Sequence, residues 1–100
     1  MRVIARGTLR EFWEQPGRQD AEEPLKAWFA HASAATWAQW ADVKADFPRA
    51  DWVGNDRVVF DIGGNKYRLV VKMEFAKQMI FIRFIGTHQE YDQIKDITTQ

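Results

Sequence analysis

The chain has 100 residues, which is the size of a single domain, so we treat residues 1–100 as one unit. Hydrophobic residues make up 46% and charged residues 28%, a balance typical of an ordered globular protein. The chain has no cysteine and only two histidines, which excludes disulfides, thiolate ligands and cysteine nucleophiles. We therefore expect neither a metal nor another cofactor.

Two further classes of protein are not indicated. No apolar run approaches the roughly 20 residues that cross a bilayer. The first six residues, Met1 to Arg6, contain no apolar stretch of the length found in export signals. We expect a cytoplasmic protein.

The charges are balanced overall but unevenly distributed. Lysine and arginine total 14, as do aspartate and glutamate. Between positions 57 and 83 only Asp61 and Glu74 are acidic. The basic residues of that window are Arg57, Lys66, Arg68, Lys72, Lys77 and Arg83. A basic segment in a neutral protein predicts a defined anionic ligand rather than general polyanion binding.

The first elements are predicted to be a short strand and two helices. Arg2 to Ala5 is compatible with a strand. Thr8 and Glu11 have the spacing of a capping box, so the first helix is expected to begin there and to end at Pro16-Gly17. Pro24 suits the first turn of the second helix.

A third helix and a turn follow. Thr36 and Gln39 form a second possible capping box, and Phe47-Pro48 is expected to end the helix that it opens. Gly54-Asn55, within positions 51–56, is a turn signal.

The pattern then changes from helix to strand. Residues 57–62 are rich in β-branched and aromatic side chains, and Gly63-Gly64-Asn65 predicts a hairpin turn. The apolar residues alternate in 66–75, as they do in a half-buried strand, and 79–85 is the next strand. Residues 86–92 are expected to leave the sheet, with a short helix after it.

This order predicts an α+β fold with helices packed on one face of a mainly antiparallel sheet. If the odd positions of 66–75 face the helices, the even positions of 79–85 should do so too. Lys72 and Arg83 would then lie opposite each other, on the same face as Arg68. Neither Arg68 nor Arg83 would be needed for the core, and no carboxylate partner is evident for them. Like charges gathered in this way favour binding of an anion.

Several segments of the second half resemble the HigB-type toxins of bacterial toxin–antitoxin systems, within the RelE-like superfamily of mRNA interferases. The resemblance covers positions 46–92 and is carried by the turn and by the last motif in combination. The matching segments are Asp46-Phe47-Pro48, residues 57–69 around Gly63-Gly64-Asn65-Lys66-Tyr67-Arg68, Ile82-Arg83, and Thr87-His88-Gln89-Glu90-Tyr91-Asp92.

This resemblance implies a compact RelE-like domain and a ribosome-dependent endoribonuclease that cleaves mRNA. It also implies a HigA-type antitoxin with a helix-turn-helix domain as partner, so that any contact with DNA would be made through the antitoxin.

Cleavage of RNA without a metal needs a proton acceptor for the 2′-hydroxyl, a cation for the phosphate and a proton donor for the leaving oxygen. His88 and Tyr91 are the candidates for proton transfer, although Tyr91 needs cationic neighbours to act as a base. Arg68 and Arg83 are the candidates for phosphate binding, and we group all four as catalytic.

Other cations are candidate RNA contacts. They are Lys66, Lys72, Lys77 and Arg57. The acidic residues nearby are too few for a two-metal site, so 2′-hydroxyl attack is the expected chemistry.

Two other functions remain open. The same basic face could belong to a noncatalytic RNA-binding module in which His88 and Tyr91 are structural. Alternatively, an exposed sheet edge could bind the antitoxin in a pure interaction domain.

Overall fold

The computed structural model describes residues 1–100 and contains a five-stranded sheet in the order β1-β5-β4-β3-β2. Strands β2 to β5 form an antiparallel meander, and β1 pairs with β5 in parallel. The strands are β1 (Arg2–Ile4), β2 (Asp51–Gly54), β3 (Arg57–Ile62), β4 (Tyr67–Glu74) and β5 (Met79–Thr87). The sequence predicted β1 and the three strands of the meander, but placed only a turn at β2.

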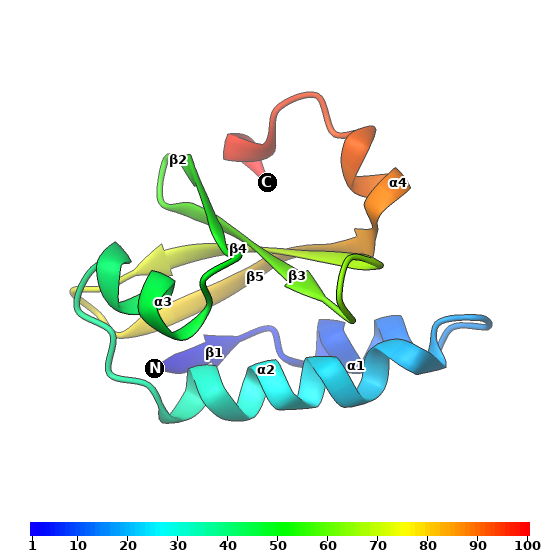
Figure 1. Ribbon diagram of the computed structural model, residues 1–100, viewed down its shortest axis with the longest axis horizontal. Coiled ribbons are helices and arrows are strands. Elements are labelled where there is room, and N and C mark those ends of the chain that lie inside the picture. The colour runs from blue at the N-terminus through cyan, green and yellow to red at the C-terminus, as the bar shows by residue number, and fades with distance from the viewer.

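Helices lie on both sides of this sheet. Helices α1 and α2 run along one face, whereas α4 and the end of the chain arch over the other (Figure 1). The helical segments are α1 (Gly7–Trp13), the 3₁₀ turn η1 (Gln19–Ala21), α2 (Glu22–Ala34), α3 (Trp40–Asp46), α4 (His88–Asp92) and the 3₁₀ turn η2 (Ile97–Thr99). None of these helices combines the length and apolar character needed to cross a membrane. The α+β fold class is confirmed.

The predicted helix starts need correction. Thr8 lies inside α1 and Thr36 lies outside α3, and neither helix has a side-chain cap. Helix α2 begins at Glu22 because η1 leads directly into it. Pro24 therefore stands in the first helical turn, where a backbone N–H has no intrahelical partner to lose. The capping box that does form joins Thr87 and Glu90 at the start of α4.

The core lies between the sheet and the layer of α1 and α2. Alternate residues of β4 face it and are almost fully buried, as the sequence predicted: Tyr67, Leu69, Val71 and Met73. Leu9 and Phe12 come from α1, and Leu25 and Trp28 come from α2. Because β-strand side chains alternate, the even residues of β4 face away from these helices.

Strand β5 contains a bulge that changes the predicted register. Val70 pairs with Phe84 but Val71 pairs with Ile82, so Arg83 is an extra residue. Lys72 lies opposite Phe81 and not opposite Arg83, which corrects the predicted pairing, because the β4–β5 hairpin pairs Glu74 with Met79. The extra residue allows Ile82 and Ile85 to share the core side, whereas strict alternation would place them on opposite faces.

We call the sheet face opposite α1 and α2 the outer face. Three cross-strand rows run over β3, β4 and β5: Asp61–Arg68–Gly86, Val59–Val70–Phe84 and Arg57–Lys72–Phe81. Val59 and Val70 are 4% and 0% exposed, although they do not belong to the core on the helical side. Helix α4 contacts β4 and β5, and η2 contacts β2, so the C-terminal segment covers part of this face (Figure 1).

Tyr67 joins three parts of the fold. It is 1% exposed, and its ring packs edge-on against Phe12 of α1 at a centroid distance of 5.3 Å. Its hydroxyl donates to the Asp20 carboxylate of η1. Tyr67 is thus a core residue that also links the sheet to α1 and η1.

We predict that Tyr67→Phe lowers the free energy of unfolding by about 1 kcal/mol, because a buried hydrogen bond is lost without a change in volume. Tyr91→Phe is the matched control, since the half-buried Tyr91 hydroxyl makes no hydrogen bond within the protein. Urea denaturation of both variants measures the difference. Equal stability of the two variants would contradict the role given to the Tyr67 hydroxyl.

Candidate functional site

Helix α4 carries the residues proposed for proton transfer. The Thr87 hydroxyl accepts from the Glu90 N–H at 3.1 Å, and the Glu90 carboxylate accepts from the Thr87 N–H at 2.8 Å. The His88 N–H donates to the Lys66 carbonyl at 3.1 Å, which ties the first turn to the β3–β4 hairpin. These bonds satisfy N–H groups that a helix start leaves free, so a helix of only five residues is held at the end of β5.

His88 is accessible and oriented. Its Nδ1 lies 2.9 Å from an Asp92 carboxylate oxygen, one helical turn away, and its side chain is 46% exposed. When the proton of a neutral imidazole is on Nδ1, beside the Asp92 carboxylate, Nε2 is an acceptor that is free to face a substrate.

The surroundings of Tyr91 raise the pKa of its phenol, whereas a general base would need that pKa to be lowered. Burial raises the pKa of its phenol, and the carboxylates of Asp51 and Asp92 raise it further, whereas only Arg68 lowers it. The phenol is therefore protonated near neutral pH and is a proton donor.

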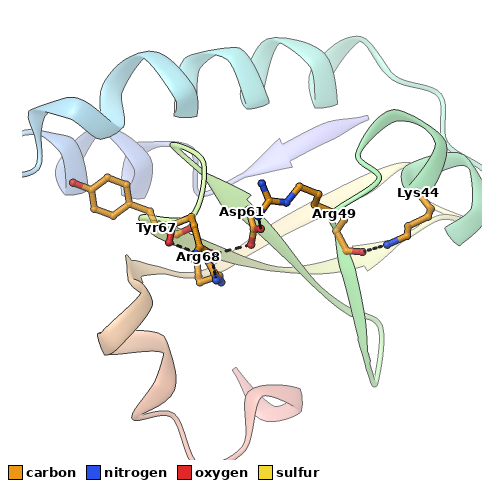
Figure 2. A network of polar contacts seen from close by, with 7 residues as sticks. Lys44, Arg49, Asp61, Tyr67 and Arg68 are labelled. Carbon is orange, nitrogen blue, oxygen red and sulfur yellow. Dashed lines mark hydrogen bonds and ion pairs between the residues drawn. The ribbon is translucent and has the colours of Figure 1, made fainter.

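Arg68 lies under the same end of the outer face and is extensively bonded. Its side chain is 11% exposed, and Nη1 lies 3.3 Å from Asp61. Nη2 donates to the Asn65 side-chain carbonyl at 2.6 Å, and Nη1 donates to the backbone carbonyls of Asn65 and Tyr67. Arg49 also reaches Asp61, at 3.3 Å, so two guanidinium groups share one carboxylate (Figure 2). The expected absence of a carboxylate partner for Arg68 is wrong.

Figure 2 shows how adjacent residues of β4 serve the two faces of the sheet. Tyr67 is directed toward the helices, whereas Arg68 is directed toward the opposite side. Arg68 thus lies outside the core on the helical side, as expected, but it is largely buried and hydrogen-bonded.

Arg83 differs from Arg68 in its exposure to solvent and in its lack of partners. It occupies the bulge of β5, is exposed, and makes no ion pair or side-chain hydrogen bond. It lies three residues before Gly86, the residue that pairs with Arg68. Arg83 is therefore the cation of the predicted catalytic set that is free to bind an anion.

The four cations proposed as RNA contacts have partners within the protein. Lys66 pairs with Asp20, and Lys72 and Lys77 lie 3.5 and 3.8 Å from the Glu74 carboxylate. Arg57 is 8% exposed, and its guanidinium donates to the Gln100 and Asn55 carbonyls. Most cations of the basic window are thus paired with carboxylates: Asp20, which precedes the window, and Asp61 and Glu74, which lie within it.

The structure places Arg68 within electrostatic reach of Tyr91 and opposite Gly86, two residues before His88. Arg83 lies three residues before Gly86 on β5. Sequence reasoning did not connect Asp92 with His88, although the i, i+4 spacing would have revealed it. The link of Arg68 to Asp61 had no such signal, because it depends on strand pairing. No group of three or more histidine, aspartate or glutamate side chains is placed to hold a metal ion.

We predict that the two arginines differ in their effect on stability. Arg68→Ala should lower the free energy of unfolding by about 2 kcal/mol, because hydrogen bonds to charged groups contribute about 1.5–3 kcal/mol. Arg83→Ala should change it by less than about 0.5 kcal/mol, as at other exposed positions. Chemical denaturation of the two variants measures this contrast, and equal destabilisation would show that Arg83 has partners of its own.

The chain has two tyrosines, and the pKa of each is raised, Tyr67 by burial and its bond to Asp20, Tyr91 by burial and nearby carboxylates. A spectrophotometric titration near 295 nm should therefore show no phenolate below about pH 10. Tyr91→Phe should remove one of the two steps. Phenolate absorbance that appears between pH 7 and 9 and is lost in Tyr91→Phe would show that Tyr91 can act as a base.

Comparison with known proteins places this chain in a family. The model of the family described as HigB_toxin, RelE-like toxic component of a toxin-antitoxin system, matches residues 21–94. The mRNA interferase toxin HigB of Escherichia coli (strain K12) is 40% identical over 52 residues, which cover 50% of each chain. The mRNA interferase HigB of Shigella flexneri gives the same values.

A further relative, the mRNA interferase HigB of Escherichia coli O6:H1, is 31% identical over 55 residues, or 53% of each chain. The match spans about half the length of these curated relatives. The family model, in contrast, covers α2, α3, α4 and the whole β2–β5 meander. This protein therefore belongs to the HigB family of RelE-like toxins of toxin–antitoxin systems.

Proposed function

We propose that this chain, acting as one toxin domain over residues 1–100, is an endoribonuclease that cleaves mRNA on the ribosome. The observation that carries the proposal is that one short helix, α4, bears both the His88 imidazole and the Tyr91 phenol, and that the charge of Arg68 acts on Tyr91. The names of the relatives, which are mRNA interferases, support the same activity.

In this proposal His88 is the general base. Asp92 holds Nδ1 at 2.9 Å, and Nε2 accepts the proton of the RNA 2′-hydroxyl. The 2′-oxygen then attacks the adjacent phosphorus and the bond to the 5′-oxygen breaks. Tyr91 gives its proton to that 5′-oxygen, a role that its raised pKa favours.

The arginines have different parts in this reaction. Arg83, exposed and without a partner, binds the phosphate through its planar guanidinium. Arg68 contributes its positive charge beside Tyr91 while it remains bonded to Asp61. Charge that develops on the phosphate is stabilised by these cations, so the chemistry is proposed to proceed without a metal.

The proposed dependence on the ribosome rests on the small number of cationic side chains that are unpaired and able to bind RNA. Three lysines are proposed to attract the RNA electrostatically without direct contact, because each already lies beside a carboxylate: Lys66, Lys72 and Lys77. Arg57 would first have to release its carbonyl partners. A single exposed guanidinium orients an RNA strand poorly, so a substrate held by the ribosome would supply the alignment. Such a substrate would place the protein in the cytoplasm.

The proposed partner is a HigA-type antitoxin with a helix-turn-helix domain, through which any contact with DNA would be made. Membership in a family of toxic components supports the existence of an antitoxin.

The test uses ribosomes programmed with an mRNA that the toxin cleaves. We expect a 2′,3′-cyclic phosphate or 3′-phosphate on the upstream fragment and a 5′-hydroxyl on the downstream one. A 2′-deoxy sugar at the cleavage site should abolish cutting, because the nucleophile is removed. A 5′-phosphate on the downstream fragment, or normal cutting of the 2′-deoxy substrate, would exclude this mechanism.

The chain offers a matched control for the base. His88→Ala should lower the cleavage rate by about 10²-fold or more. His31→Ala should leave it unchanged, although His31 is equally exposed at 49% and lies 3.0 Å from its own carboxylate, Asp46. RNA binding without cleavage by the unmodified protein would instead favour the noncatalytic RNA-binding module. Binding of antitoxin but not RNA would favour the interaction domain.

A further inference from the structure

One ion pair links the helical layer to α4 across the sheet. Arg18, in the loop between α1 and η1, donates from Nη2 to a Glu90 carboxylate oxygen at 3.0 Å. The two residues are 72 positions apart in sequence. The Arg18 side chain is 25% exposed, and its guanidinium lies over the Phe12 ring at 4.6 Å. Packing on the core residue Phe12 therefore holds the Arg18 guanidinium in place.

The other side of the pair is fixed by α4 itself. One Glu90 carboxylate oxygen accepts from Arg18, and the other accepts from the Thr87 N–H at 2.8 Å. The carboxylate is thus shared between the start of α4 and the α1–η1 loop. Helix α4 has only five residues, too few for a helix to be stable by itself, so its orientation depends on such contacts.

The junction between β5 and α4 shows how closely this carboxylate is seated. A Cβ built on Gly86 would lie 3.1 Å from the Glu90 Oε1 and 2.6 Å from Phe84 Cζ. The absence of a side chain at Gly86 therefore makes room for both groups. Glu90 is packed against the strand from which α4 departs.

A second contact, from η1 directly after Arg18, reaches the same end of the sheet. The Asp20 carboxylate accepts from the Lys66 ammonium and the Tyr67 hydroxyl. Lys66 in turn accepts the His88 N–H through its backbone carbonyl. Residues 18–20 thus bind both the first turn of α4, through Glu90, and the β3–β4 hairpin, through Lys66.

We infer that Arg18 is a positioning residue for the proposed reaction: through Glu90 it sets the orientation of α4, and with it the positions of His88 and Tyr91. This inference rests on the proposed function. Arg18 would touch neither the RNA nor the reacting atoms. Its effect arises because reaction rates fall steeply when reacting groups are displaced by even 1 Å.

The test compares Arg18→Met, which keeps an apolar stem over Phe12, with Arg10→Met as the matched control. Arg10 also pairs with a carboxylate, Glu14, at 3.1 Å, but within one exposed helical segment. Arg18→Met should lower kcat for ribosome-bound mRNA about tenfold or more with KM unchanged, and Arg10→Met should leave both unchanged. Glu90→Gln should also lower kcat, and the double variant Arg18→Met/Glu90→Gln should fall no further than the worse single variant.

A second measurement is independent of activity. Hydrogen exchange of the Glu90, Gln93 and Ile94 amides in the free protein should accelerate in Arg18→Met and not in Arg10→Met. If the unmodified protein cleaves no mRNA, the proposed function fails, while faster exchange still shows that Arg18 holds α4. Unchanged exchange, unchanged kcat, or a rise in KM with kcat preserved would each overturn the positioning role of Arg18.

Discussion

The bulge in β5 is the constraint on which the rest of this structure depends. Ile80, Ile82 and Ile85 all pack toward the helical layer, which a strictly alternating strand cannot achieve. One extra residue, Arg83, resolves the conflict and is left exposed. The strand beyond it is shifted so that Gly86 meets Arg68, and α4 starts over the outer face (Figure 1). The demands of the core thus produce both the free arginine and the position of His88.

Fewer cations are available to bind an anion on the outer face than the basic composition of residues 57–83 indicates, because most of them are paired. Arg68 shares Asp61 with Arg49 (Figure 2). Lys66 pairs with Asp20. Burial of a charge is costly unless it is paired, which explains why the largely buried Arg68 has acceptors on several sides. Anion recognition by this face therefore depends on the few groups that stay accessible, rather than on the summed charge of the segment.

Residues 18–20, at the end of the α1–η1 loop and in η1, link α4 and the β3–β4 hairpin to the core. Arg18 lies on Phe12 and binds Glu90, while Asp20 receives the buried Tyr67 hydroxyl. Polar contacts between segments far apart in sequence thereby hold a helix that is too short to orient itself. A helix tethered by so few bonds is sensitive to single substitutions far from the residues that it carries.

The sequence by itself determined the α+β class, the β3–β4 hairpin and the buried face of β4, because alternation and turn residues are local signals. It also indicated His88 and Tyr91 through a motif. Only the tertiary structure decided that β2 exists, that Arg83 occupies a bulge, and that Arg68 is paired. The raised pKa of Tyr91 likewise depends on burial and on Asp51, 40 positions away. Strand register and ion pairs between distant segments arise from packing that satisfies the whole core at once, and no local pattern records them.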